Sequence, residues 1–170
     1  MGRDKALLEI DGVAMAARVA SALTDAGAAE VRCVGGDLAS LRALGLDATR
    51  DDDEGAGPLA GLITGIESSD DSIVVVSPCD LVAPRAQVFR DLVNTLTGSD
   101  TAVAAAVPLV DERWRPLPVA IRHDAVASLR ASFDSGERAV HRVLERLQLV
   151  VVDVGSIEDA DAPEDLPGHR

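Results

Sequence analysis

Asp80 is the residue whose position in the chain most clearly suggests chemistry. It follows Ile73 to Val76, a continuous β-branched run, and the intervening Pro78 lacks a backbone donor and ends strand pairing. A run without a polar face is typical of a strand buried on both faces of a parallel sheet. Ligands bind at the carboxyl ends of such strands, and Mg²⁺ prefers one or two carboxylates together with substrate phosphates. For an isolated Pro-Cys-Asp, the alternative is an aspartate that caps the next turn.

Two other segments could hold a phosphorylated ligand. Lys5 is a compact cation with three donors, which suits triphosphate oxygens, although a lysine near a terminus is usually a solvated surface residue. Gly57-Pro58 and Gly61 allow a tight backbone turn and a helix that starts close to a ligand, or they mark a plain helix start. The acidic run that begins at Asp51 precedes this segment, and a solvated acidic loop is its plain alternative.

The composition narrows the classes of partner. The 170 residues carry 29 acidic and 16 basic side chains, and this net charge of -13 argues against non-specific binding to nucleic acid or to an anionic membrane surface. With one Trp, two Phe and no Tyr, an aromatic platform for single-stranded nucleic acid is not expected. Two cysteines make no disulfide framework, and no stretch approaches the roughly 20 apolar residues of a membrane span. The amino terminus does not read as a signal peptide, so we expect a cytoplasmic protein.

The order of the expected elements predicts an α/β fold. Ala6 to Ile10 is a short apolar run that ends at the turn pair Asp11-Gly12, and residues 47–56 show no periodicity and are expected to form a loop. Helices are expected over residues 13–26, 38–44, 59–67, 87–96, 124–133 and 139–147, and strands over residues 30–34, 73–76, 101–110, 117–122 and 149–154, the last of them buried. Strands alternating with helices favour one domain, residues 1–170, with a mostly parallel sheet.

Six segments in order resemble the molybdenum cofactor guanylyltransferases, within the sugar-nucleotide-like nucleotidyltransferases. They are Gly2-Arg3-Asp4-Lys5-Ala6-Leu7-Leu8 with Asp11-Gly12, Gly57-Pro58-Leu59-Ala60-Gly61, Pro78-Cys79-Asp80, Pro116-Leu117-Pro118, Gly136-Glu137-Arg138 and Ala162-Pro163-Glu164-Asp165-Leu166. The resemblance covers nearly the whole chain. It implies a three-layer α/β/α sandwich with a mostly parallel, Rossmann-like sheet, of the nucleotide-diphospho-sugar transferase type.

The resemblance also implies a reaction and a site. The family transfers GMP from GTP to the phosphate of molybdenum-molybdopterin and releases pyrophosphate. Lys5 matches its phosphate-binding lysine, Asp80 its magnesium-binding aspartate, and Asp51 its nucleotide-contacting acid, with Asp52 or Asp53 as alternatives. The expected partners are GTP, Mg²⁺ and a molybdopterin-type acceptor, and the expected state is a monomer or a weak oligomer. A related cytidylyl or other nucleotidyltransferase and a non-catalytic degenerate homologue are the alternatives.

The chain departs from the family pattern in three places. Family members carry a strand and a glycine-rich phosphate loop directly before the Met-Gly at which this chain begins, so we expect the 170 residues alone to be a poorly stable and poor enzyme. Pro-Cys-Asp is normally followed by x-Pro, but three residues separate Asp80 from Pro84. In the carboxy-terminal segment, Asp161 is either a second metal ligand or a tail acid that faces water. His123, His141 and His169 lie outside the motifs.

Overall fold

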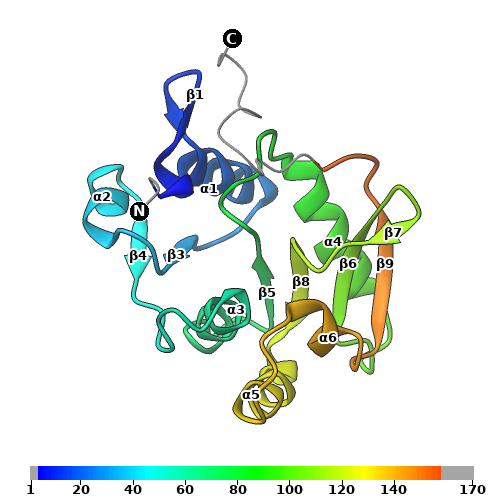
Figure 1. Ribbon diagram of the computed structural model, residues 1–170. Helices are drawn as coiled ribbons and strands as arrows, with labels where there is room; N and C mark the ends of the chain where they lie inside the picture. The colour runs from blue at the N-terminus through cyan, green and yellow to red at the C-terminus, as the bar shows by residue number, and fades with distance from the viewer. Residues whose placement is uncertain (1–3, 158–170) are drawn as a thin grey trace.

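The computed structural model describes residues 4–157, whose elements alternate between helices and strands (Figure 1). The helices are α1 Met15–Ala26, α2 Leu38–Ala43, α3 Pro58–Glu67, α4 Ala86–Gly98, α5 Val126–Asp134 and α6 Val140–Leu144, with the 3-10 turns η1 Lys5–Leu7 and η2 His123–Ala125. The strands are β1 Glu9–Ile10, β2 Val13–Ala14, β3 Arg32–Val34, β4 Asp47–Thr49, β5 Ile73–Val76, β6 Ala105–Val110, β7 Arg113–Trp114, β8 Val119–Arg122 and β9 Leu149–Asp153. The expected α/β class is confirmed.

The largest sheet is mixed, and its main strands mostly share one direction. It has five strands in the order β5-β8-β6-β7, and β9 also pairs with β6. Since β8 runs antiparallel to both β5 and β6, those two strands point the same way, and β9 runs parallel to β6. The carboxyl ends of β5, β6 and β9 therefore lie at one edge of the sheet, which is the edge where α/β proteins bind ligands.

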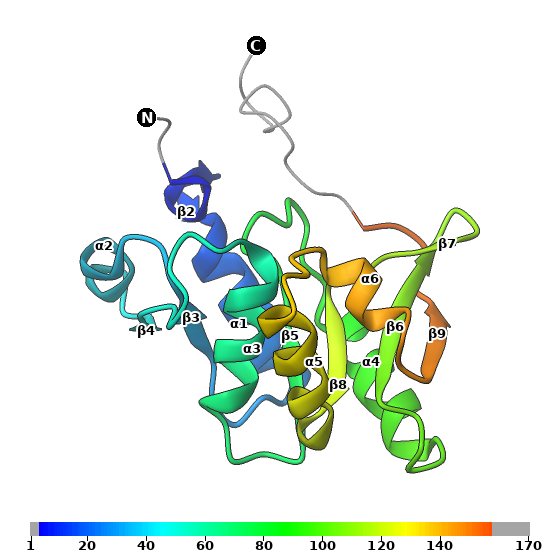
Figure 2. The same ribbon diagram turned by 60° about the horizontal axis from the view of Figure 1, so that its bottom comes forward.

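Helices cover both faces of this sheet, as the expected three-layer sandwich requires (Figure 2). Successive side chains of a strand point to opposite faces. Ala105 and Val107 of β6 accordingly join the cluster formed with α3, α5 and α6, whereas Ala106 and Val110 join the cluster with Val88, Leu92 and Leu96 of α4. The alternation lets short aliphatic side chains of one strand serve two cores.

The helix boundaries follow local signals in the sequence. Helix α1 ends at Gly27, whose φ of 103° lies in the left-handed region that glycine adopts without a steric penalty. Pro58 occupies the first turn of α3, where a missing backbone donor costs nothing, and Gly57 before it has a φ of 93°. No helix within residues 4–157 is both long and apolar enough to cross a membrane.

Strand β5 differs from its expected environment. All four of its residues are half-buried rather than buried, because the strand lies at the end of its sheet and pairs only with β8 among the described residues. On the other side of β5, β3 and β4 form a separate parallel two-stranded sheet (Figure 1). Both faces of β5 are still covered, because Val74 and Val76 pack against the cluster of α3, α5 and α6, and Ile73 and Val75 against the cluster of α4. The expected placement of the strand between two layers is therefore confirmed, and only its degree of burial is lower than expected.

Three other expectations need correction. Residues 47–56 are not all loop, because Asp47–Thr49 forms β4 in parallel register with β3. The segment 13–26 begins with the short strand β2, which closes a hairpin with β1 across Asp11-Gly12, before α1 starts. Strand β9 is not buried, since Val151 is 50% exposed on the outer strand of the sheet.

Candidate active site

Lys5 and Asp80 come together although 75 positions separate them, and the Lys5 Nζ lies 3.7 Å from Asp80 Oδ2. Lys5 opens η1, and Asp80 follows the carboxyl end of β5. The two side chains are 45% and 27% exposed, so both charges remain accessible to a ligand in solvent. A partly exposed pair of this kind stabilises a fold by about 1 kcal/mol at most, which makes it weak as a structural device.

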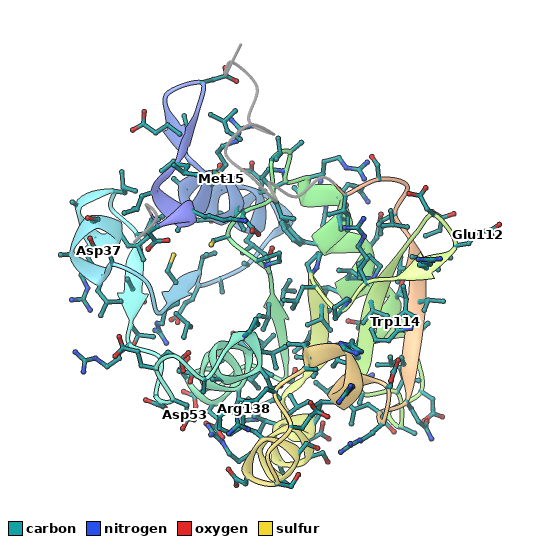
Figure 3. All side chains as sticks on the ribbon, viewed as in Figure 1. Met15, Asp37, Asp53, Glu112, Trp114 and Arg138 are labelled. Atoms are coloured by element: carbon teal, nitrogen blue, oxygen red, sulfur yellow. The ribbon has the colours of Figure 1, made fainter. Side chains whose placement is uncertain are left out.

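Asp4 fixes the segment that carries Lys5. Its Oδ1 accepts a hydrogen bond from the Ala6 amide at 3.1 Å and caps η1, and its Oδ2 accepts one from the Asp37 amide at 3.1 Å. Gly36 lies between β3 and Asp37 with a φ of 75°, and a Cβ on it would sit 3.0 Å from Asp4 Oδ2. The turn after β3 thus approaches the lysine segment so closely that the Asp4 carboxylate would have to shift to admit a side chain at Gly36. Asp37 labels this corner in Figure 3.

Asp51 is held against α3. Its Oδ1 accepts hydrogen bonds from the Thr64 hydroxyl at 3.2 Å and from the Asp53 amide at 3.1 Å. Thr64 is the buried polar residue among the described residues, at 3% exposure. Gly61 lies one turn before Thr64 on the same helix face, and a Cβ there would be 3.7 Å from Asp51 Oδ2. The carboxylate therefore sits over a bare patch of helix near its amino end.

The structure separates the three aspartates that follow β4. Asp52 is exposed, and its amide donates to Thr64 Oγ1 at 3.3 Å. Asp53 turns the other way and pairs with Arg130 of α5 at 2.7 Å. Asp51 is thus the acid of this run that faces the glycines of α3 and of the turn after β3, where Gly35 would place a Cβ 3.7 Å from Asp51 Cβ.

These residues share one edge of the molecule. Asp80 follows the end of β5, Gly35-Gly36 follows the end of β3, and Asp51 follows the end of β4. Lys5 and Asp80 form one contact, while Asp51 is connected to the lysine segment through the glycine turn and Asp4. The three residues expected from the sequence are therefore linked by a chain of contacts that runs from Asp80 through Lys5, Asp4 and the turn after β3 to Asp51.

The metal-binding potential of this edge rests on one carboxylate. Within residues 4–157, no cluster of three or more His, Cys, Asp or Glu side chains forms a complete cation cage. An accessible single carboxylate such as Asp80 nevertheless fits Mg²⁺, which commonly takes one or two carboxylates and completes its octahedron with substrate phosphates and water. The second expected ligand, Asp161, lies outside the described residues.

Cys79 lies directly before Asp80 in the chain, and nearby carboxylates influence its thiol. Desolvation of its thiol, together with the nearby carboxylates of Asp80 and Asp4, raises the pKa of Cys79 to about 11. Although the residue as a whole is exposed, the negative charge of the two carboxylates disfavours the thiolate even where water reaches the sulfur. At neutral pH this thiol is protonated and is a poor nucleophile.

The histidines and the late glycine motif take no part in this edge. The His123 amide donates to Ser72 O at 3.0 Å, which places His123 at the opposite, amino end of β5. Glu137 accepts hydrogen bonds from the Arg138 and Ala139 amides at 2.8 and 3.0 Å. The Gly136-Glu137-Arg138 segment is thus a local turn directly before α6, which begins at Val140, and His169 lies outside the described residues.

Sequence reasoning missed Asp4, Thr64 and Arg130. Asp4 stands directly before Lys5, where an aspartate is a standard cap, and Thr64 lies three residues after Gly61 on the same helix face. Both signals were present in the sequence. Arg130 is 77 positions from its partner Asp53, and nothing local in the sequence connects them.

The chain has the architecture of the nucleotidyltransferases. Its solved neighbours share this Rossmann-like fold, among them the molybdopterin-guanine dinucleotide biosynthesis protein A of Archaeoglobus fulgidus, with a TM-score of 0.67 and 22% identity over 90% of this chain and 76% of that one. The model of the MobA-like NTP transferase domain matches residues 1–151. The chain therefore belongs to the MobA-like NTP transferase family.

Two curated relatives show how far the likeness extends. The molybdenum cofactor guanylyltransferase of Bordetella petrii is 30% identical over 85% of this chain and 78% of its own length. The probable molybdenum cofactor guanylyltransferase of Bacillus licheniformis is 32% identical over 61% of this chain. The aligned part spans about half the length of that relative, 51%. The expected family is thus confirmed. Whether this chain has the activity of these relatives is a separate question, which the proposal below takes up.

Proposed function

We propose that the protein transfers GMP from GTP to the terminal phosphate of a molybdopterin-type acceptor that carries molybdenum, with release of pyrophosphate. The observation that supports this most directly is the contact of Lys5 with Asp80 at the carboxyl end of β5. A cation and a carboxylate, both accessible and placed at a ligand-binding sheet edge, are what a nucleoside triphosphate with its divalent ion requires.

Each side chain has a separate task in this proposal. Lys5 places its ammonium group against the β- and γ-phosphate oxygens, and so it stabilises the charge that accumulates on the departing pyrophosphate. Asp51, held by Thr64, accepts hydrogen bonds from the nucleoside at the bare face of α3. The acceptor phosphate is itself the nucleophile, so no side-chain nucleophile is needed, and the protein contributes orientation and electrostatics.

Asp80 is the residue that would hold Mg²⁺. A bound Mg²⁺ supplies positive charge to the phosphate oxygens as the bond to the leaving pyrophosphate breaks. Asp80 follows the end of β5 by four residues, and the pairing of β5 with β8 fixes the point from which this segment leaves the sheet. When Lys5 moves to the phosphates, Asp80 loses a cationic neighbour at 3.7 Å and becomes fully available to the metal.

The test compares pyrophosphate release by the wild-type chain with that by Asp80→Ala and Asp80→Asn, in the presence of GTP, Mg²⁺ and the acceptor. Asp91→Ala is the matched control, because Asp91 is an aspartate on α4 that accepts a hydrogen bond from Gln87 of its own helix at 2.6 Å. We expect release to fall at least about 100-fold in both Asp80 variants, as for the loss of a principal electrostatic group, and to be unchanged in the control. Undiminished release by Asp80→Ala would reject the assignment.

Nucleotide choice is tested in the same assay. Replacing GTP by CTP or ATP at equal concentration separates guanylyl transfer from the related cytidylyl reaction. Calorimetry with GTP and with guanosine then tests Lys5, because Lys5→Ala should weaken GTP binding and leave guanosine binding unchanged. An absence of both turnover and GTP binding, in the 170-residue chain and in the same chain extended by the strand and glycine-rich loop of the family, would favour the non-catalytic homologue.

A further inference from the structure

Arg130 of α5 joins three parts of the chain through its guanidinium group. Its NH1 donates to Asp53 Oδ2 at 2.7 Å, and its Nε and NH2 donate to the two carboxylate oxygens of Glu67 at 3.2 and 2.7 Å. Glu67 ends α3, and Asp53 belongs to the loop that precedes α3. The planar, forked donor set of arginine matches carboxylate geometry, so both contacts are directional.

The position of Arg130 is itself fixed by packing. It lies 5.6 Å from the centroid of the Phe133 ring, and Arg138 stacks closely over the same ring at 3.9 Å. Phe133 and Leu129 of α5 are both buried in the core cluster with α3 and α6. In Figure 3, Asp53 and Arg138 lie on the same side of the molecule, beside α5. The guanidinium is therefore mounted on the rigid framework rather than on a mobile loop.

The loop next to this arginine carries the proposed nucleotide contact. The Asp53 amide donates to Asp51 Oδ1 at 3.1 Å, and the Asp52 amide donates to Thr64 Oγ1 at 3.3 Å. Arg130 holds the side chain of the same Asp53 whose backbone holds the Asp51 carboxylate. A displacement of Asp53 would therefore be transmitted to Asp51 through one hydrogen bond.

We propose that Arg130 is a positioning residue that sets the place of the Asp51 carboxylate for nucleotide binding. This inference rests on the proposed function, because it assigns Arg130 a role toward the nucleotide without contact to it. The Arg130 side chain is 27% exposed, and the side chains of its two partners, Asp53 and Glu67, are 35% and 36% exposed. An ordinary exposed ion pair contributes little to stability or to geometry. A positioning role for Arg130 can therefore be distinguished by experiment from a purely structural one.

The first experiment measures loop order without any ligand. Hydrogen–deuterium exchange at the Asp52 and Asp53 amides is followed in the full chain and in Arg130→Gln and Asp53→Asn. Arg90→Gln is the matched control, since Arg90 donates to Asp25 O at 2.6 Å far from this loop in the sequence. We expect exchange at both amides to accelerate in the first two variants only. Unchanged exchange in Arg130→Gln overturns the inference, whether or not the protein turns over.

The second experiment measures GTP affinity by calorimetry in the presence of Mg²⁺. We expect Arg130→Gln and Asp53→Asn to weaken GTP about fivefold each, and the double variant to be no worse than either single one, because both break the same link. Arg130→Lys should recover part of the loss, since lysine keeps the charge but not the fork. Glu67→Gln, which leaves the contact with Asp53, should have the smallest effect.

The outcomes separate the inference from the function on which it rests. If Asp51→Ala weakens GTP but Arg130→Gln does not, the positioning role is wrong and the proposed nucleotide site stands. If thermal stability falls in Arg130→Gln while GTP affinity is unchanged, Arg130 is merely structural. If Asp51→Ala binds GTP as tightly as the wild-type chain does, the nucleotide role of Asp51 fails first.

Discussion

Lys5 Nζ and Asp80 Oδ2 lie 3.7 Å apart, beyond the length of a charged hydrogen bond, which is about 2.7 to 2.9 Å. The two groups therefore attract each other as charges without being locked in one geometry. No short bond between these two groups has to break before Asp80 turns toward a ligand. A site that must exchange one partner for another at every turnover benefits from such a loose contact.

The first prediction uses the fact that Lys5 is the only lysine of the 170-residue sequence. An amine-reactive reagent should modify Lys5 and the α-amino group, and these two are distinguished by peptide mass. We expect GTP with Mg²⁺ to slow modification of Lys5 while leaving the α-amino group unprotected, because the triphosphate covers the ammonium group. The same experiment with guanosine is the control, and equal protection by guanosine would contradict a phosphate contact.

The second prediction concerns the reactivity of Cys79, read in a Cys33→Ser background. Only the thiolate is alkylated, and a pKa of about 11 leaves about one thiol in a thousand ionised at pH 8. The rate should therefore keep rising with pH through 9 and 10 instead of levelling off. Asp80→Asn removes a negative neighbour, lowers the pKa and should accelerate alkylation at pH 8. A rate that levels off near pH 9 in the wild-type background would be inconsistent with this environment.

The third prediction compares two glycines. Gly36→Ala forces a side chain into a φ of 75° and within 3.0 Å of Asp4 Oδ2, so we expect a loss of about 1 to 2 kcal/mol of folding free energy. Gly98→Ala is the matched control, because no atom lies within 4 Å of its added Cβ and its φ is ordinary. It should be neutral or stabilise α4 slightly. Denaturant unfolding of both variants measures the difference.

The fourth prediction tests the anchor of Asp51. Thr64→Val preserves the side-chain shape, but it removes the hydroxyl that donates to Asp51 and accepts from the Asp52 amide. We expect unfolding free energy to fall by about 1 to 2 kcal/mol, because partly buried groups lose their partners. GTP affinity should fall as well. Thr64→Ser keeps the hydroxyl and should retain GTP affinity, and a Thr64→Val variant that binds GTP normally would remove Asp51 from the site.

The parts of the site that could be predicted from the sequence are those with local signals. The β-branched run of residues 73–76 and Pro78 after this run marked the end of the strand before Asp80. The family resemblance added Lys5 and Asp51. The two covered faces of β5 were expected correctly, but its place at the end of the sheet was not, because a run of Ile and Val indicates how well a strand can be buried and not how many strands pair with it. Strand β9 shows the same error, since Val151 is apolar and still half exposed at the outside of the sheet.

The other parts depend on contacts between distant segments. Strand β4 has only three residues, Asp47–Thr49, and exists because β3 pairs with it. Its composition alone favours a loop. The three aspartates differ only in the structure, where Thr64 donates to Asp51 and Arg130 donates to Asp53. No pattern within the acidic run distinguishes three consecutive aspartates.

The unpaired edge of β5 also bears on the association of one copy of the chain with another. Its backbone donors and acceptors on that side have no strand partner among residues 4–157, and its half-buried valines add apolar surface to them. If this edge stays unpaired, strand pairing between two copies is a second-order process whose rate rises with the square of protein concentration. For the 170-residue chain, light scattering over a series of protein concentrations is therefore the measurement that would detect pairing at this edge.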